Sequence, residues 1–332
     1  MPLPDLDGAS ILVTGGTGSF GRAFVKSVLA RWKPARLVVF SRDELKQYEM
    51  QQDPLIGGQD CMRFFLGDVR DVNRMETAMR GIDTVIHAAA LKQITAAEYN
   101  PFECIHTNVL GAENVVQAAI RAGVRRVVAL STDKAANPIN LYGASKLASD
   151  KLFVAGNNMA GSVATRFAVV RYGNVLGSRG SVVPLFRRLL DEGAKELPIT
   201  DERMTRFWIT LDQGVNFVLS SLQMMRGGEI FVPKIPSSTV VDLACAMAPQ
   251  AAIRNVGIRP GEKLHELMIT EDDARTTLEM DDRYVIEPAF GWWKRKPGQS
   301  EVSVPDQFVY ASNNNPELLG RNQLARLIEA IG

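Results

Sequence analysis

Tyr142 and Lys146 stand four residues apart, and Thr132-Asp133-Lys134 precedes them in the chain. On a helix, residues at this spacing share a face, so the Lys146 ammonium can stabilise the Tyr142 phenolate and lower its pKa toward neutrality. Such a tyrosine can take a proton from an alcohol that is being oxidised. Asp133 and Lys134 add an acid and a base. The alternative is plain solvation, with Tyr-x-x-x-Lys on an exposed helix face and Asp-Lys in a loop after a strand.

A glycine-rich turn near the N-terminus favours the catalytic interpretation. Residues 11–13 are apolar and lead into Thr14-Gly-Gly-Thr-Gly-Ser-Phe-Gly21, after which a helical pattern follows. Gly15, Gly18 and Gly21 predict a tight turn, a close approach to a pyrophosphate, and close helix packing. The same turn would place Thr17, Ser19 and Phe20 against a cofactor. This glycine spacing and Tyr-x-x-x-Lys together resemble the short-chain dehydrogenase/reductase superfamily, whereas the glycines alone could form an ordinary strand-to-helix turn.

Composition bounds the class of protein. The 332 residues are 46% apolar and 23% charged, enough for one large α/β domain with an appended lobe, or for two domains. A formal net charge of +1 predicts no bulk attraction to nucleic acid or an anionic membrane. Cys61, Cys104 and Cys245 are odd in number and scattered, which argues against a disulfide framework and a metal site. Without a signal-peptide layout or an apolar stretch that could span a bilayer, we expect a cytoplasmic protein.

Short apolar runs recur along the first half of the chain and alternate with helical patterns. They cover residues 10–13, 37–40, 63–66, 84–87, 127–130 and 167–170. Such runs are typical of strands buried on both faces, so we expect an α/β fold with a Rossmann-type doubly wound parallel sheet. Ligands should bind at the carboxyl ends of its strands. The alternation weakens after residue 175, which predicts a cofactor-binding domain over 1–175 and a smaller substrate lobe over 176–332, with some segments returning to the first domain.

The residues after the second strand bear on the choice of cofactor. Ser41 and Arg42 come first, and Lys46 follows one helical turn later. An arginine at this place suits the 2′-phosphate of NADP, whereas a carboxylate would bind the ribose of NAD. We therefore expect NADP, with NAD as the alternative if Asp43 or Glu44 turns toward the ribose. The charged run could also simply begin a helix.

Two further strand ends complete the predicted cofactor pocket. Asp68-Val69 follows the third strand, and Ala88-Ala89 follows the fourth. We expect Asp68 and Val69 to line the adenine pocket, although an aspartate after a strand is also a common helix N-cap.

Longer motifs occur through most of the chain. They include Leu-Ser-Thr-Asp-Lys-Ala-Ala-Asn-Pro-Ile-Asn-Leu-Tyr-Gly-Ala-Ser-Lys at 130–146, Arg-Tyr-Gly-Asn-Val-Leu-Gly-Ser-Arg-Gly-Ser-Val at 171–182, Met-Thr-Arg-Phe-Trp at 204–208 and Arg-Pro-Gly-Glu-Lys at 259–263. Together they resemble the inverting UDP-N-acetylglucosamine 4,6-dehydratases, which start pseudaminic acid biosynthesis for flagellin glycosylation. Thr-Asp-Lys is the most discriminating element, because retaining relatives carry Thr-Asp-Glu. One departure is Ile94-Thr95, where the family has Val-Pro.

The resemblance implies a role for each catalytic residue. Tyr142 would take the C4 hydroxyl proton while hydride passes to NADP, Thr132 would hydrogen-bond to the same oxygen, and Lys146 would hold Tyr142 and the nicotinamide ribose. Lys134 would then remove the C5 proton, and Asp133 would protonate the departing C6 hydroxyl. The hydride would return to C6 with inversion at C5, so that a tightly bound cofactor is regenerated in each turnover.

Two of these roles require shifted pKa values. Lys134 must be neutral to act as a base, and crowding by Lys146, Lys92 and a cationic nicotinamide would depress its pKa. Asp133 must carry a proton, so its carboxyl should be partly desolvated and its pKa raised.

The resemblance also implies how UDP-N-acetylglucosamine is held. A nearly neutral chain must bind two phosphates locally, which is the role implied for Arg206 and Arg259, while Glu262 would bind the uridine ribose. Lys92 would lie between the nicotinamide and the sugar. The full implied substrate set is Lys92, Asn174, Ser178, Arg179, Ser181, Val182, Val183, Arg206, Arg259 and Glu262.

Other functions remain open from the sequence. A retaining 4,6-dehydratase or a 4-epimerase of another UDP-sugar would use the same fold, but Asp133-Lys134 argues against both. A cofactor-sensing regulator without turnover would usually lack Tyr142 and Lys146. The family also implies a homo-oligomer, a dimer or a hexamer. The charge, the cysteines and the hydropathy predict no metal, nucleic-acid or membrane partner.

Overall fold

The computed structural model describes residues 3–178, 180–290, 293 and 301–331. Among these residues, ten strands form one sheet in the order β16-β14-β15-β10-β6-β5-β4-β1-β2-β3. The first six are β1 Ser10–Thr14, β2 Arg36–Ser41, β3 Met62–Leu66, β4 Thr84–His87, β5 Arg126–Thr132 and β6 Arg166–Tyr172. They are mutually parallel, and their order 3-2-1-4-5-6 is that of the Rossmann fold. The predicted fold class and the six predicted strands are confirmed.

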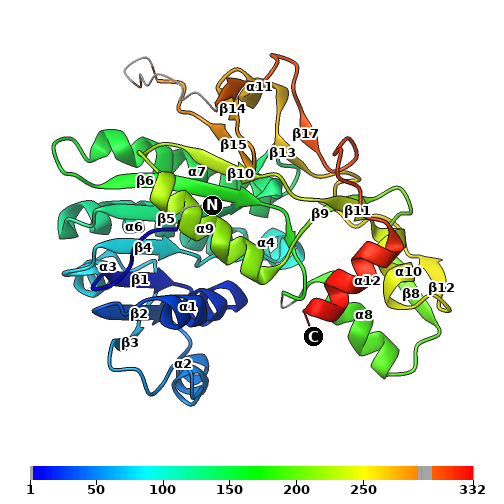
Figure 1. Cartoon of the computed structure of the whole chain (residues 1–332), viewed down its shortest axis with the longest axis horizontal. Coiled ribbons are helices and arrows are strands. Elements are labelled where there is room, and N and C mark those ends of the chain that lie inside the picture. The colour runs from blue at the N-terminus through cyan, green and yellow to red at the C-terminus, as the bar shows by residue number, and fades with distance from the viewer. Residues whose placement is uncertain (1–2, 179, 291–292, 294–300, 332) are drawn as a thin grey trace.

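Helices cover both faces of this sheet (Figure 1). On one face α1 Ser19–Arg31 packs against α9 Leu211–Met224, and on the other α6 Gly111–Ala122 lies between α3 Val72–Met79 and α7 Leu141–Met159. The first half also contains α2 Glu44–Gln51, α4 Ile94–Tyr99, α5 Pro101–Ile105, a π-helical turn at His106–Leu110 and a 3-10 turn at Asp133–Ala135.

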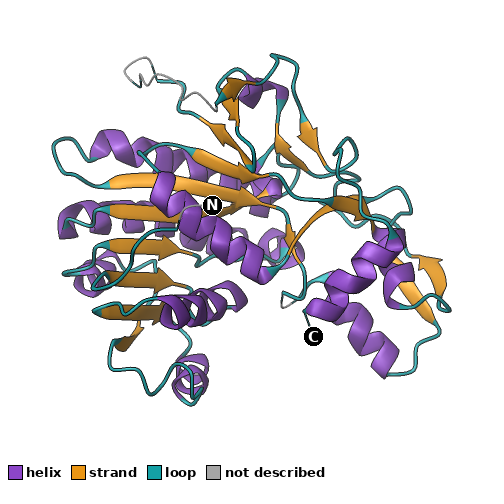
Figure 2. Ribbon diagram, viewed as in Figure 1, coloured by secondary structure: helices purple, strands orange, loops and turns teal. Residues whose placement is uncertain are grey.

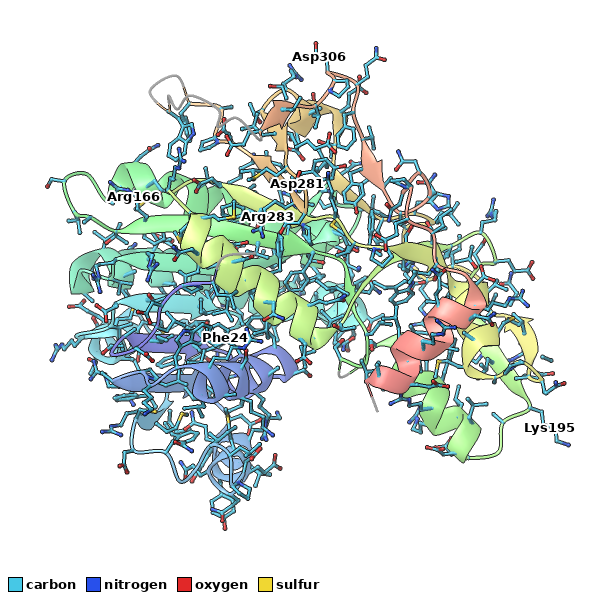
Figure 3. The ribbon with its side chains drawn as sticks, in the orientation of Figure 1. Phe24, Arg166, Lys195, Asp281, Arg283 and Asp306 are labelled. Carbon is cyan, nitrogen blue, oxygen red and sulfur yellow. The ribbon has the colours of Figure 1, made fainter. Side chains whose placement is uncertain are left out.

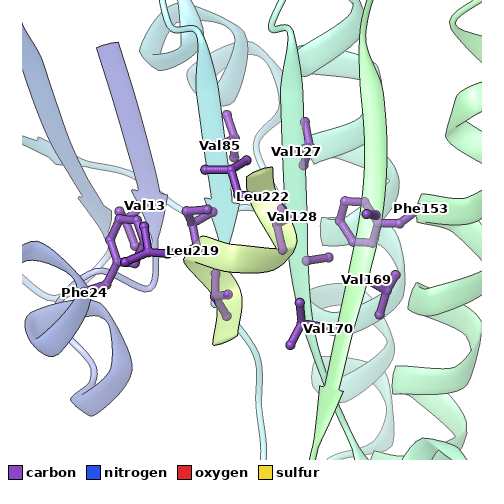
Figure 4. Close-up of a cluster of buried hydrophobic side chains, with 14 of the residues drawn as sticks. Val13, Phe24, Val85, Val127, Val128, Phe153, Val169, Val170, Leu219 and Leu222 are labelled. Atoms are coloured by element: carbon purple, nitrogen blue, oxygen red, sulfur yellow. The ribbon is translucent and has the colours of Figure 1, made fainter. Parts of the chain in front are cut away.

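The apolar runs explain this layering. All of β4 and all but the first residue of β1 and β2 are buried, so both faces of the sheet need a helical cover. Figure 4 shows Leu219 and Leu222 of α9 packed over Val13, Val85 and Val128 of the central strands. The main core therefore lies between the sheet and its helices.

The second half of the chain returns to the sheet. β10 Ile230–Pro233 pairs parallel with β6, and the antiparallel strands β15 Arg283–Ile286, β14 Thr277–Glu279 and β16 Val302–Ser303 extend that edge. Arg283, labelled in Figure 3, ties this edge to α9. Its guanidinium donates to the hydroxyls of Ser220 (2.8 Å) and Ser221 (3.1 Å) and lies over the Phe217 ring.

Most of the remaining elements form a smaller lobe beside the sheet (Figure 2). Its core helices and strands are α8 Val182–Asp191, α10 Val240–Met247, α12 Arg321–Ala330, β7 Asn174–Val175, β8 Glu196–Ile199, β9 Thr205–Ile209, β11 Ser237–Thr239 and β12 Ala252–Asn255. β13 Leu267–Ile269 pairs with β17 Tyr310–Ala311, and α11 Glu271–Ala274 follows β13. Two small apolar clusters, one containing Trp208 and one containing Phe186, hold the lobe together. Within the part of the chain that the structure describes, every helix is too short or too polar to cross a membrane.

Candidate active site

A cavity of about 1120 Å³ lies between the carboxyl ends of the parallel strands and the C-terminal lobe. Lobe residues such as Trp208 and Val240 line it together with residues that follow β1, β2, β4 and β5. The sequence-predicted residues that line it are Gly15, Thr17, Gly18, Ser19, Phe20, Gly21, Ser41, Arg42, Lys46, Asp68, Val69, Ala88, Ala89, Lys92, Thr132, Lys134, Tyr142, Lys146, Asn174, Ser178, Ser181, Val182, Arg206, Arg259 and Glu262. The folding of the chain therefore brings nearly the whole predicted set to one space.

The glycine turn after β1 has the geometry of a dinucleotide cradle. Gly15 has a φ of 64°, and a Cβ there would lie 2.8 Å from the backbone nitrogen of Ala89. A Cβ on Gly21 would lie 2.4 Å from the Cα of Gly16, so the helix can pack this closely only without a side chain. Gly18 is the N-cap of α1 and offers no side-chain cap, which leaves that helix terminus open to an anion. These residues fit the pyrophosphate of a dinucleotide.

The charged residues after β2 are partly engaged with one another. Asp43 is the N-cap of α2: one carboxylate oxygen accepts from the Lys46 backbone N–H (3.0 Å), and the other pairs with the Lys46 ammonium. The charged run does begin a helix, as the alternative interpretation held. The Arg42 side chain is half exposed at the cavity.

Asp68 also lies among basic groups. Its carboxylate pairs with Arg70 (2.7 Å) and lies 3.6 Å from an Arg42 nitrogen. The side chain that caps α3 is Asp71, so the helix-cap alternative for Asp68 is wrong. Nearby, the Ser41 and Thr17 hydroxyls form a hydrogen bond of 2.9 Å, which joins the end of β2 to the glycine turn.

The helix that carries Tyr142 and Lys146 begins at a defined point beside Lys134. Asn140 caps α7, because its side-chain oxygen accepts from the Gly143 backbone N–H at 2.7 Å. A Cβ on Gly143 would lie 2.2 Å from the Lys134 carbonyl oxygen. The glycine after Tyr142 therefore lets α7 approach the Asp133–Ala135 turn closely.

Lys134 lies between two carboxylates. Its Nζ is 3.0 Å from Asp133 Oδ1 and 3.2 Å from Glu266 Oε1, and it donates to the side-chain oxygen of Asn174 at 3.4 Å. Burial would lower the pKa of Lys134, but the two carboxylates outweigh burial and raise it above its ordinary value. The predicted neutral Lys134 is therefore wrong for the free protein, since anions rather than Lys146 and Lys92 are its close neighbours.

Asp133 is fully buried and does not line the cavity. Its Oδ1 accepts from the Thr132 hydroxyl at 2.8 Å and from Lys134, whereas its Oδ2 has no partner. Burial raises the pKa of Asp133, with Lys134 opposing, so the predicted direction is confirmed. In this arrangement its carboxyl is connected to the cavity through Thr132 and Lys134.

The pKa of Tyr142 is shifted in the direction opposite to the prediction. Burial raises the pKa of Tyr142 to about 12, against smaller contributions from the Lys134 charge and a hydrogen bond with Thr132. The predicted lowering by Lys146 is therefore wrong for the free protein, because desolvation of the phenolate dominates. Burial also lowers the pKa of Lys146, and the Asp150 carboxylate one helical turn later opposes that shift.

The substrate side contains one buried and one exposed arginine. Arg206, on β9, donates to the carbonyl oxygens of residues 205 (2.7 Å), 264 (3.0 Å) and 263 (3.0 Å), and its Nε lies 3.7 Å from Glu266 Oε1. Arg259 is exposed and lies 3.9 Å from the Glu262 carboxylate. Asn140 donates to the carbonyl of Gly261 at 2.7 Å, which ties this loop to the start of α7.

One described residue of the predicted substrate set does not join the others. Val183 is buried in the cluster with Leu176 and Trp208 and is absent from the cavity lining, whereas its neighbour Val182 lines the cavity. Consecutive residues of a helix point in different directions, so α8 cannot turn both valines to the cavity. Arg179 lies outside the described residues.

Sequence reasoning missed Glu266 and Lys263. Glu266 is 2% exposed, yet it lines the cavity and contacts both Lys134 and Arg206. Lys263 donates to the Ala136 carbonyl at 2.6 Å and so joins the loop that precedes β13 to the end of the Asp133–Ala135 turn. Lys263 is the last residue of the Arg-Pro-Gly-Glu-Lys motif and Glu266 follows three residues later, but no local spacing relates either of them to the distant Lys134.

Metal ligands do not cluster in the described ranges, where no group of three His, Cys, Asp or Glu side chains could hold an ion. Cys61, Cys104 and Cys245 are free thiols.

The fold and the cavity define an enzyme of the extended short-chain dehydrogenase/reductase type. Similar sequences support this class. A family model described as Polysaccharide biosynthesis protein matches residues 11–288. A Campylobacter jejuni protein named UDP-N-acetylglucosamine 4,6-dehydratase (inverting) is 54% identical, over 97% of this chain and 98% of that protein. A Rickettsia canadensis protein named UDP-glucose 4-epimerase is 43% identical, over 83% of this chain and 82% of that protein.

Solved structures agree with this class. Pen from Bacillus thuringiensis matches with a TM-score of 0.90 and 34% identity, over 98% of both chains. DesIV, a dTDP-glucose 4,6-dehydratase from Streptomyces venezuelae solved with NAD and TYD bound, matches with a TM-score of 0.67 and 27% identity, over 77% of this chain and 86% of that one. The chain belongs to the Polysaccharide biosynthesis protein family, and within it to the relatives of the inverting UDP-N-acetylglucosamine 4,6-dehydratases, as its motifs indicated.

Proposed function

We propose that this chain is an inverting UDP-N-acetylglucosamine 4,6-dehydratase that forms UDP-2-acetamido-2,6-dideoxy-β-L-arabino-hex-4-ulose, the first step of pseudaminic acid biosynthesis. The observation that carries the proposal is the 54% identity, over almost the whole chain, to the Campylobacter jejuni protein of that name. The cavity supports it, because Thr132, Lys134 and Tyr142 face the same space as the glycine turn.

The first chemical step is oxidation at C4. A bound nicotinamide dinucleotide would accept the hydride from C4 and return it to C6. Tyr142 takes the C4 hydroxyl proton, with Thr132 hydrogen-bonded beside it. Because burial holds the pKa of Tyr142 high in the free protein, the tyrosine starts as a phenol and must first give its own proton to solvent. The Lys146 ammonium one turn away would stabilise the phenolate that then takes the C4 hydroxyl proton.

The second step is loss of water across C5 and C6. The C4 ketone acidifies the C5–H bond, and Lys134 takes that proton. Asp133 protonates the departing C6 hydroxyl, which agrees with the raised pKa that burial gives its carboxyl. A proton then adds to C5 on the opposite face, which gives the inverted product.

The cofactor that we propose is NADP. Asp43 is engaged at the α2 N-terminus and with Lys46, whereas Arg42 stands half exposed at the cavity. A 2′-phosphate would suit this arrangement better than a bare ribose. DesIV holds NAD, so the choice in this chain depends on its own residues after β2.

The diphosphate of the substrate would bind to Arg206 and Arg259, and its uridine ribose to Glu262. Arg206 is fixed by three carbonyl oxygens, so it presents a pre-positioned charge, and Arg259 supplies a second charge from an exposed loop. Lys92 and Asn174 line the same cavity as these arginines and Tyr142. We also propose that residues 1–175 act mainly as the cofactor-binding domain and 176–332 as the substrate lobe.

Proton NMR of the purified protein with UDP-N-acetylglucosamine in heavy water, without added cofactor, tests the proposal. We expect a new C6 methyl signal, deuterium at C5 and the couplings of the L-arabino configuration. Couplings of the D-xylo configuration would instead mean retention, and the absence of any turnover would contradict the substrate.

Lys134→Ala should abolish both product formation and deuterium exchange at C5, because loss of a general base typically costs about 10²- to 10⁴-fold. Its control is Lys151→Ala, which removes an exposed lysine of α7 and should leave turnover unchanged. Equal activity of the two variants would contradict the role of Lys134.

A 4-epimerase is the second candidate, because the Rickettsia canadensis relative carries that name at 43% identity. Epimerisation needs C4 oxidation and reduction but no base at C5 and no acid at C6. In the same spectra it would give a UDP-sugar inverted at C4, without a methyl signal and without deuterium at C5.

A further inference from the structure

Glu266 is a buried charged residue at the cavity to which neither the motifs nor the proposed reaction assigns a task. It precedes β13, its side chain is almost fully buried, and its Oε1 lies 3.2 Å from Lys134 Nζ and 3.7 Å from Arg206 Nε. Its second oxygen, Oε2, is buried and has no hydrogen-bond partner. A buried carboxylate oxygen without a donor is costly, and the cost disappears when the carboxyl takes up a proton.

The proposed reaction meets a difficulty at Lys134. A base at C5 must be a neutral amine, but Lys134 lies between the carboxylates of Asp133 and Glu266 and is an ammonium in the free protein. The Lys134 proton must therefore pass to one of these two carboxylates or to solvent before the C5 proton can be removed.

We propose that Glu266 receives this proton and thereby converts Lys134 into the base, an inference that rests on the proposed dehydratase reaction. One N–H bond of the Lys134 ammonium breaks and leaves its electron pair on nitrogen, and an O–H bond forms on the Glu266 carboxylate. Both groups become neutral, so no net charge leaves the buried site. The amine then takes the C5 proton, and the Glu266 proton returns to the network when the product leaves. Glu266 acts through Lys134 and is a positioning residue in this scheme.

Asp133 is less suited to receive the proton. Its Oδ1 already accepts from the Thr132 hydroxyl as well as from Lys134, and in the proposed reaction it must arrive with its own proton for the C6 hydroxyl. Glu266 has no such task in the reaction. Its Oε2, like Asp133 Oδ2, has no donor, and its Oε1 contacts Lys134 and Arg206, whose charges outweigh burial and hold the pKa of its carboxyl low in the free protein.

Arg206 links the proton transfer to substrate binding. In the free protein its guanidinium stabilises the Glu266 carboxylate from 3.7 Å. A substrate diphosphate that pairs with Arg206 would neutralise part of that charge and so raise the proton affinity of Glu266. The charged and titratable groups that face Lys134 and Glu266 from the packed elements are Asp133 of the 3-10 turn, Tyr142 of α7, Arg206 of β9 and Lys263 of the loop before β13.

Glu266→Gln is the test, because glutamine keeps the shape of the side chain but cannot take the proton. In the wild type the transfer is internal, so kcat should be flat between about pH 7 and about pH 9. In Glu266→Gln, Lys134 can lose its proton only to solvent, so kcat should fall at least about tenfold at neutral pH and rise about tenfold per pH unit. KM should change much less than kcat.

A single-turnover measurement locates the defect. Glu266→Gln should still reduce bound nicotinamide at the C4 step, seen by absorbance, but should incorporate deuterium at C5 slowly. Loss of the C4 step would overturn the proposal, because Glu266 would then act earlier. A kcat profile that is lower but parallel to the wild type would mean a merely structural role and would also overturn it, as would an unchanged kcat.

Two further variants guard against misfolding and nonspecific charge effects. Glu266→Asp keeps a carboxylate and should retain a flat pH profile of kcat, at a lower kcat than the wild type. This variant tests the proposal if Glu266→Gln does not fold. A kcat that rises with pH in Glu266→Asp would overturn the proposal. Glu279→Gln, which breaks a partly exposed pair with Lys234, is the matched control and should behave as wild type. If the wild type itself forms no product, the proposed function fails; if it does and Glu266→Gln keeps a flat profile, only this inference fails.

Discussion

The cofactor side and the substrate side of the cavity are built in different ways. On the cofactor side, backbone atoms of the glycine turn between β1 and α1 pack closely against one another, as Gly21 does against Gly16. The residues of this turn lie within a few positions of one another in the sequence. On the substrate side Lys134, Arg206 and Glu266 come from three distant segments and meet as buried charges. The first side depends on close packing, and the second on the balance of a charge network.

The difference teaches where function can be adjusted. The close backbone packing fixes the conformation of the glycine turn, so the turn binds a dinucleotide in the same way whichever reaction the enzyme catalyses. A charge network changes its protonation when one member changes, so it determines which reaction follows oxidation at C4. The following variants test whether stability and binding respond in these two ways.

Arg206→Met should have the largest effect. It leaves Glu266 with one cation fewer in a buried site and removes three hydrogen bonds to carbonyl oxygens. Breaking a buried ion pair costs about 3–5 kcal/mol, so we expect a loss of that order in the free energy of unfolding, measured with urea. The KM for UDP-N-acetylglucosamine should also rise.

The control for Arg206→Met is Arg203→Met, which removes an exposed arginine paired with Asp201. It should change neither stability nor KM appreciably. Equal, small effects of both variants would mean that the substrate side does not depend on its buried charges, and the comparison would lose its basis.

Gly21→Ala tests the packing of the cofactor side and should have a smaller effect. The new Cβ would meet Gly16 backbone atoms at 2.4 Å, so one of the two segments must move. Overpacking of this kind costs about 1–3 kcal/mol of unfolding free energy, and the purified protein should carry less bound nicotinamide. The measurements are urea unfolding and the cofactor content per chain.

The matched control is Gly214→Ala, in the interior of α9, where a Cβ would meet nothing within 4 Å. Alanine is the better helix former by about 1 kcal/mol, so this variant should be as stable as wild type or slightly more stable. If Gly21→Ala also gained stability and kept its cofactor, the close backbone contact would not be what shapes the turn.

The same contrast explains how much the sequence could predict. The six parallel strands, the glycine turn and the meeting of Tyr142 with Lys134 were predictable, because each depends on a short apolar run or on residues near the carboxyl ends of neighbouring strands. Glu266 was not, because its contact with Lys134 depends on how the lobe folds back over β5 and β6. The wrong pKa directions of Lys134 and Tyr142 have the same cause, since burial and a distant carboxylate decide them.

Arg42→Ala should have the smallest effect and decides between the two cofactors. Arg42 is half exposed and only 3.6 Å from Asp68, so its bond to a 2′-phosphate would be partly screened. We expect the Kd of NADP to rise about tenfold, which corresponds to about 1.4 kcal/mol, while the Kd of NAD stays unchanged. Both constants can be measured by fluorescence on protein stripped of its cofactor.

Arg70→Ala is the control for Arg42→Ala, because Arg70 pairs with the same Asp68 but does not line the cavity. Any effect through Asp68 should weaken NADP and NAD equally in this variant, whereas loss of a phosphate ligand should weaken NADP alone. The contrary result is an unchanged ratio of the two Kd values in Arg42→Ala together with a higher Kd of NAD in Asp43→Ala. That result would mean that the Asp43 carboxylate binds the ribose. The cofactor side would then select its ligand through Asp43, despite the engagement of that carboxylate with Lys46.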